Sequence, residues 1–141
     1  MVAGILALVS CGTKAPEGEL VSLEYTVQGT MAGYQYEGRF SPGGDGGFVL
    51  TGMKEAYGPL FRKKIGKVEV DQFRQIILEE KMYEYKSHYR PFFDVRDGTN
   101  WTFRARFSDG STIFSHGMNA YPKGNGLKRV RELFTSLVID P

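Results

Sequence analysis

The sequence predicts an α+β domain in which an antiparallel sheet of about five to six strands is covered on one face by two helices. Two observations lead to this prediction. Several short segments alternate between apolar and polar residues, whereas two longer segments carry apolar residues at helical spacing. The chain also contains 18 Gly residues and 13% aromatic residues, which favours a sheet-rich fold with many turns. The predicted order is strands, helix, hairpin, helix.

The first part of the chain predicts three strands. Residues 21–27 alternate strictly and predict a half-buried strand. Residues 34–40 alternate as well, with Gly38 at an inward position, which indicates a bulge or a close neighbour. The Gly-rich run 42–47 lacks the Lys-Ser/Thr ending of a phosphate-binding loop, so we interpret it as a hairpin turn before a strand at 48–51.

A fourth strand is expected at residues 60–65, which carry Arg62, Lys63 and Lys64. Natural sheets place Lys on edge strands to prevent edge-to-edge pairing, so we expect this strand at an edge. The alternative is a basic patch that contacts anionic lipid head groups, acidic glycans or a protein partner.

Two helices are predicted from apolar periodicity. The first extends over residues 70–83, with Asp71 as its N-cap and Phe73, Ile76 and Ile77 facing the sheet. The last helix packs on the sheet through six apolar side chains: Leu127, Val130, Leu133, Phe134, Leu137 and Val138.

Residues 101–107 and 112–116 predict a β-hairpin, because the first segment alternates regularly and turn residues separate the two. Its register has two alternatives. A two-residue loop would place Phe114 and His116 on the same face as Trp101. A three-residue loop with a bulge at Gly110 would place Ile113 and Ser115 there instead. The environment of His116 therefore stays open.

An uncharged apolar run occupies residues 1–10 and leads into Leu8-Val9-Ser10-Cys11-Gly12. This motif resembles the lipobox of bacterial lipoproteins. The resemblance implies a signal peptide at residues 1–10, acyl chains such as palmitate on Cys11, and a flexible linker at residues 11–19. No Lys or Arg precedes the run, so we expect the signal peptide to be truncated at its start. The alternative is an apolar N-terminal strand that ends in an incidental buried Cys.

Composition limits the remaining chemistry. Cys11 is the only Cys, which excludes disulfides, Cys-based zinc sites and a thiol nucleophile from the folded part. A net charge of +2 argues against a nucleic-acid partner. Residues 20–141 suffice for a single globular domain with one core.

Three segments resemble a small uncharacterised domain found in bacterial lipoproteins and other exported proteins. They are Asp97-Gly98-Thr99-Asn100-Trp101, the Asp109-Gly110 turn and Gly117-Met118-Asn119-Ala120-Tyr121-Pro122. The resemblance covers about residues 60–138. It implies the bacterial cell envelope, on either a periplasmic or a surface face, and it implies no activity.

Residues that would carry catalysis are scarce. His88 and His116 are the only histidines, they lack zinc-binding spacing, and no nucleophile elbow is present. We therefore predict no catalytic residues, no metal site and no cofactor. Asp94, Asp97 and Asn100 are spaced unlike a calcium-binding loop, and we interpret Asp97-Gly98 as a turn.

We predict a lipid-anchored, non-enzymatic envelope protein that binds a protein, peptide or glycan. The membrane is a further partner through the anchor. Loops and aromatic side chains often form binding sites, so the candidate binding residues are Trp101, His116, Asn119 and Tyr121. The structural alternative is that Trp101 and Tyr121 belong to the core. The functional alternatives are a small envelope hydrolase that uses His116, and a purely architectural or inhibitory lipoprotein.

Overall fold

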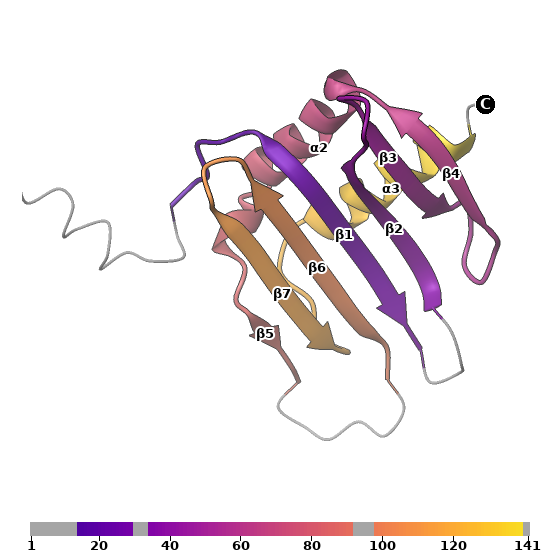
Figure 1. Cartoon of the computed structure of the whole chain (residues 1–141). Helices are drawn as coiled ribbons and strands as arrows, with labels where there is room; N and C mark the ends of the chain where they lie inside the picture. Colours follow the sequence, from indigo (N-terminus) through magenta and orange to yellow (C-terminus); the bar gives the residue numbers. More distant parts are fainter. Residues whose placement is uncertain (1–13, 30–33, 92–97, 140–141) are drawn as a thin grey trace, which may run out of the picture.

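The computed structural model describes residues 14–29, 34–91 and 98–139. The expected signal peptide, Cys11, Asp94 and Asp97 lie outside these residues. The α+β class is confirmed, with two helices and a single sheet (Figure 1). The elements are β1 (Leu20–Gln28), β2 (Tyr34–Pro42), β3 (Phe48–Met53), β4 (Leu60–Ile65), α2 (Lys67–Glu79), the 3₁₀ turn η1 (Met82–Glu84), β5 (His88–Tyr89), β6 (Asn100–Phe107), β7 (Thr112–Met118) and α3 (Gly126–Ile139).

The sheet has seven strands in the order β4-β3-β2-β1-β6-β7-β5. Six of them pair antiparallel, and β5 pairs parallel to β7, so the sheet is mixed rather than purely antiparallel. The prediction of five to six strands missed β5. A strand of two residues is too short to show an alternating pattern, and Pro91 follows it closely.

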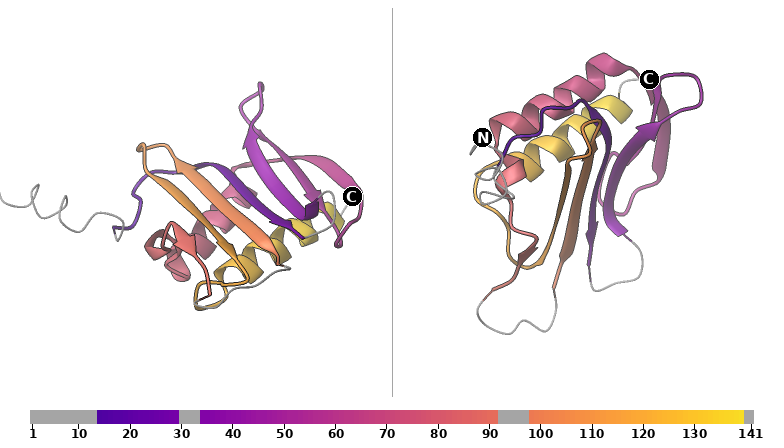
Figure 2. Two further views of the ribbon diagram at one scale, coloured as in Figure 1. Left: turned by 90° about the horizontal axis from the view of Figure 1, so that it is seen from below. Right: turned by 60° about the vertical axis from the view of Figure 1, so that its left-hand side comes forward.

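Both helices cover the same face of the sheet (Figure 2). Phe134 of α3 packs on Phe73 of α2, with ring centroids 4.6 Å apart, and both rings are fully buried. Gly38 of β2 lies directly beneath: a Cβ atom there would come within 2.8 Å of the Phe134 ring. The close neighbour expected at Gly38 is therefore confirmed. Within the described residues, neither helix combines the length and the apolar composition that crossing a bilayer requires.

The start of α2 differs from the prediction. The helix begins at Lys67, and the Glu69 carboxylate accepts a hydrogen bond from the Gly66 N–H at 2.9 Å. Asp71 is not the N-cap: it lies one turn inside the helix, where it pairs with Lys67 at 3.0 Å. Lys81 then adopts a left-handed conformation (φ 52°), which ends the helix before Met82.

The β6–β7 hairpin has the three-residue loop. The Phe107 N–H donates to the Ser111 carbonyl at 2.9 Å, and Gly110 has a φ of +89°, which Gly adopts without strain. Ser115 therefore shares the helix-covered face with Trp101. His116 points to the opposite, open face.

The basic strand β4 lies at one edge of the sheet, as predicted. Lys63 donates a hydrogen bond to the Leu137 carbonyl near the end of α3 at 2.9 Å, and Lys64 pairs with Asp45 at 3.3 Å. Two of its cations therefore already contact the protein itself.

Candidate functional site

The candidate site lies where β1, β6 and β7 extend beyond the two helices (Figure 2). At this end the loop from β7 to α3 returns along the helix-covered face. Asn119 begins the loop in a left-handed conformation (φ 54°), and its side-chain oxygen accepts a hydrogen bond from the Thr99 N–H at 3.0 Å. Its own N–H donates to the Thr99 carbonyl at 3.1 Å. The role of Asn119 is therefore to fix the loop against the start of β6.

Trp101 holds the next part of the loop. Its indole N–H donates to the Ala120 carbonyl at 2.8 Å. Gly117 makes this contact feasible, because a Cβ atom there would lie 2.7 Å from both the Ala120 oxygen and the indole nitrogen. The loop backbone consequently follows the indole ring closely.

Tyr121 stacks on Trp101, with ring centroids 6.1 Å apart and an angle of 16° between the planes. Trp101 is only 1% exposed, whereas Tyr121 is 53% exposed. Trp101 is thus a core residue, in line with the structural alternative considered for it, and it supports the exposed ring of Tyr121.

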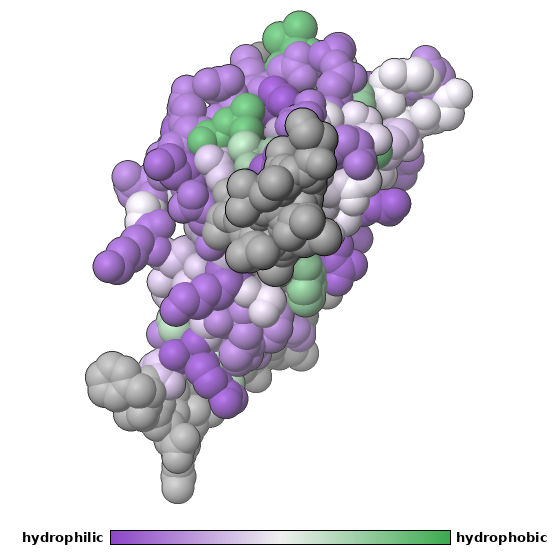
Figure 3. Space-filling model, turned by 90° about the vertical axis from the view of Figure 1, so that its left-hand side faces the viewer, coloured by the Kyte–Doolittle hydropathy of each residue, from purple (hydrophilic) through white to green (hydrophobic). Residues whose placement is uncertain are grey.

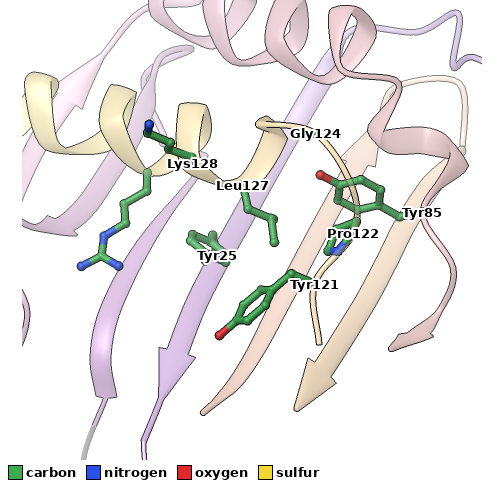
Figure 4. A pocket seen from close by; sticks show the side chains of 8 residues that line it. Tyr25, Tyr85, Tyr121, Pro122, Gly124, Leu127 and Lys128 are labelled. Carbon is green, nitrogen blue, oxygen red and sulfur yellow. The ribbon is translucent and has the colours of Figure 1, made fainter. Parts of the chain in front are cut away.

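A cavity of about 320 Å³ opens beside Tyr121. Figure 4 shows the Tyr25 and Tyr121 side chains pointing toward a common space below Leu127. Tyr25 comes from β1 and Tyr121 from the loop, so the pocket joins the sheet to the start of α3. We call this cavity the tyrosine pocket. Its lining residues are Tyr25, Tyr85, Tyr121, Pro122, Gly124, Leu127, Lys128 and Arg131.

The pocket combines neutral phenols with positive charge. Burial raises the pKa of Tyr25 to about 12, although the Arg131 charge opposes the shift. Burial also raises the pKa of Tyr85. The Arg131 guanidinium lies 4.3 Å from the centroid of the Tyr36 ring, which orients it beside the pocket. Both phenols therefore stay protonated at neutral pH and can donate or accept hydrogen bonds.

A second hollow of about 570 Å³ adjoins the tyrosine pocket and shares Tyr85, Tyr121 and Pro122 with it. Cations outnumber carboxylates around the two hollows. The carboxylates are Glu80 and Glu84, and Glu80 is already paired with Arg129 at 3.1 Å. The cations are Lys81, Lys86, Lys123, Lys128 and Arg131.

The structure brings together three of the four residues predicted from the sequence. Trp101, Asn119 and Tyr121 form one unit at this end, but His116 lies on the opposite face of the sheet beside His88. Among the described residues, no carboxylate hydrogen-bonds to His116. The same part of the chain has no cluster of three or more His, Cys, Asp or Glu side chains that could hold a metal ion.

The sequence reasoning missed Tyr25, Tyr85 and Arg131. Tyr25 is one of the alternating residues of the strand expected at 21–27, and Arg131 falls between the apolar positions of the last helix. Only the return of the β7–α3 loop brings them together, and no local pattern encodes that path. No family model matches the chain, and no curated protein matches it in sequence.

Proposed function

We propose that this protein is a lipid-anchored, non-enzymatic binding protein of the bacterial cell envelope, and that its tyrosine pocket holds an anionic oligosaccharide. One observation carries the choice of ligand: tyrosine rings and unbalanced cations line the same two hollows. The flat ring faces suit the apolar faces of sugar rings, while the phenol groups suit their hydroxyls. Lys and Arg supply the partner for a carboxylate or sulfate on the sugar.

The arrangement of the two hollows favours an oligomer over a single sugar. They share Tyr85, Tyr121 and Pro122, so they are neighbouring compartments. A linear chain of ring units can place one unit in each compartment. The protein as a whole carries a net charge of only +2, so the excess of cations is local to the two hollows.

The proposed lipid anchor is attached at the end of the domain that lies away from the tyrosine pocket. The backbone N–H groups of Glu17 and Gly18 donate to the Asp109 carboxylate at 3.0 and 3.1 Å, which fixes the end of the linker at the β6–β7 turn. Trp101 lies at the other end of this hairpin, and Tyr121 stacks on it. About seven residues of strand separate the two ends, or roughly 20 Å. A lipid on Cys11 would thus hold the tyrosine pocket away from the membrane surface.

The ligand can be tested by intrinsic fluorescence, because Trp101 is the only Trp and it stacks on Tyr121. We expect uronic-acid oligomers to change the emission saturably, and neutral hexose oligomers of equal length to do so more weakly. Tyr121→Ala should weaken binding at least about tenfold, as expected when an aromatic anchor is removed.

The matched control is Tyr57→Ala. Tyr57 is equally exposed, at 55%, but it lies in the β3–β4 loop. The Tyr57→Ala variant should bind the uronic-acid oligomer with the affinity of the wild type. Equal affinity of the wild type and Tyr121→Ala would contradict the site. Tighter binding of acidic peptides than of any oligosaccharide would contradict the ligand class.

The anchor is tested separately by mass spectrometry of the membrane fraction. We expect a lipid-modified peptide that begins at Cys11. Mature protein with an unmodified Met1 terminus would contradict the anchor without affecting the ligand proposal.

A further inference from the structure

The two histidines of the chain meet on the open face of the sheet, opposite the tyrosine pocket. Parallel pairing of β5 with β7 aligns His88 with His116. The His88 Nδ1 atom lies 3.2 Å from the Nδ1 atom and 3.3 Å from the Nε2 atom of His116. The ring centroids are 4.5 Å apart and the planes are tilted by 58°. Two imidazole rings from separate strands are therefore held side by side.

Two hydrogen bonds fix the segment that precedes His88 against β7. The His116 N–H donates to the Ser87 carbonyl at 3.1 Å, and the Ser115 hydroxyl donates to the Lys86 carbonyl at 2.5 Å. These two hydrogen bonds hold the chain that leads into β5 against β7. The register of the two imidazoles is consequently set by the sheet rather than by side-chain flexibility.

We propose that His88 and His116 chelate a divalent transition-metal ion. Zinc binds imidazole nitrogen at about 2.0–2.1 Å, so two nitrogens in a tetrahedral site lie about 3.3–3.4 Å apart. The nitrogens of His88 and His116 are 3.2–3.3 Å apart, so the two imidazoles are close enough to reach one ion once their rings turn. His88 Nδ1 lies almost equally far from both His116 nitrogens, which places it over the face of that ring. His88 is exposed and His116 is partly exposed. Chelation would require both rings to turn until one lone pair of each points at the same ion.

The donor set selects the class of metal. Imidazole suits Zn²⁺, Ni²⁺ and Cu²⁺, whereas Mg²⁺ and Ca²⁺ require several oxygen ligands. Among the described residues, no carboxylate hydrogen-bonds to either ring. Two imidazoles leave further coordination positions open on the ion, and Cu²⁺ should bind most tightly by the usual order of affinities.

A bound ion would also lock β5 onto the sheet. This strand has two residues and pairs with β7 alone. Its Tyr89 packs toward the covered face against Trp101, with ring centroids 5.8 Å apart. The metal would thus brace the edge strand that supports the Trp101 end of the domain. Figure 3 views the molecule from this edge, where hydrophilic residues predominate.

The test uses Cu²⁺ and Zn²⁺ with the untagged protein, with Mg²⁺ as the negative control. Electron paramagnetic resonance of the one-to-one copper complex should show coupling to two imidazole nitrogens. His88→Gln and His116→Gln should each weaken Cu²⁺ binding at least about tenfold, because each removes one arm of the chelate. Thr112→Ala, on the same face of β7, should bind copper as the wild type does.

Stability provides an independent measurement. Zn²⁺ should raise the Tm of the wild type and slow hydrogen exchange at His88 and Tyr89, because the unfolded chain lacks the paired site. The Tm of each variant without metal shows whether it is folded. Copper coupled to a single nitrogen, or unchanged affinity in either folded His variant, would overturn the proposal.

Discussion

The two faces of the sheet are built from different kinds of interaction. The covered face is aromatic and dry: Phe40, Phe73, Phe103 and Phe134 are all at most 2% exposed. The open face relies on cross-strand pairs of polar and charged side chains, such as Arg39 with Glu24 at 3.2 Å. Burial of apolar area dominates folding free energy, whereas exposed ion pairs contribute little. The covered face should therefore determine stability, and the open face should be free to serve other purposes.

The largest effect is expected at Phe134. Its ring contacts Phe73 and Phe40 and covers Gly38, and it is fully buried. Phe134→Ala should lower the free energy of unfolding by about 3–5 kcal/mol, and Phe134→Asp should unfold the domain. Urea denaturation followed by circular dichroism measures both. Unaltered stability of Phe134→Asp would show that the covered face is not the core.

An intermediate effect is expected at Arg39, on the open face. Glu37 is 8% exposed, and its carboxylate pairs with the Arg39 guanidinium at 2.6 Å. Arg39→Ala leaves this carboxylate without its main partner and should cost about 1–2 kcal/mol in the same assay. Adding Glu37→Gln should recover part of the loss, since the unpaired charge is then gone. A loss as large as that of Phe134→Ala would erase the difference between the two faces.

The smallest effect is expected at the β6–β7 turn. The pKa of Asp109 is lowered to about 2, chiefly by a hydrogen bond from the Ser111 N–H and also by those of Glu17 and Gly18. An unfolded Asp titrates at about 3.9, so the stabilisation by the carboxylate is complete above about pH 5 and is lost as pH falls toward about 2. The Tm difference between wild type and Asp109→Asn should therefore be constant near neutral pH and shrink in acid. A difference that grows in acid would contradict this role of Asp109.

Regular periodicity explains which parts of the fold were predictable. The alternation of β1 and β6 and the apolar positions of α3 were read correctly because one face of each element is buried against one partner. The α2 start was misplaced because Gly66 caps the helix through its backbone and Glu69, whereas Asp71 has the residue type of an N-cap. The residue type of Asp71 alone therefore did not show where the helix begins.

The candidate site was only partly predictable, for a similar reason. Tyr121 and Asn119 stood out because they lie in a loop, but the tyrosines that complete the pocket come from β1 and from the turn after α2. His116 was assigned to the same site, although the three-residue turn at Gly110 places it on the other face. One additional residue in a hairpin loop reverses the face of every following side chain, and the sequence left that choice open.

We propose that the tyrosine pocket, on the helix-covered side of the sheet, is the ligand-binding site of this protein. The most direct measurement is a nuclear magnetic resonance titration of the isotope-labelled protein with a uronic-acid oligomer. We predict saturable shifts at Tyr25, Tyr121 and Lys128, with none at His88 or His116. Shifts confined to the two histidines, or no shifts at all, would contradict ligand binding at the tyrosine pocket.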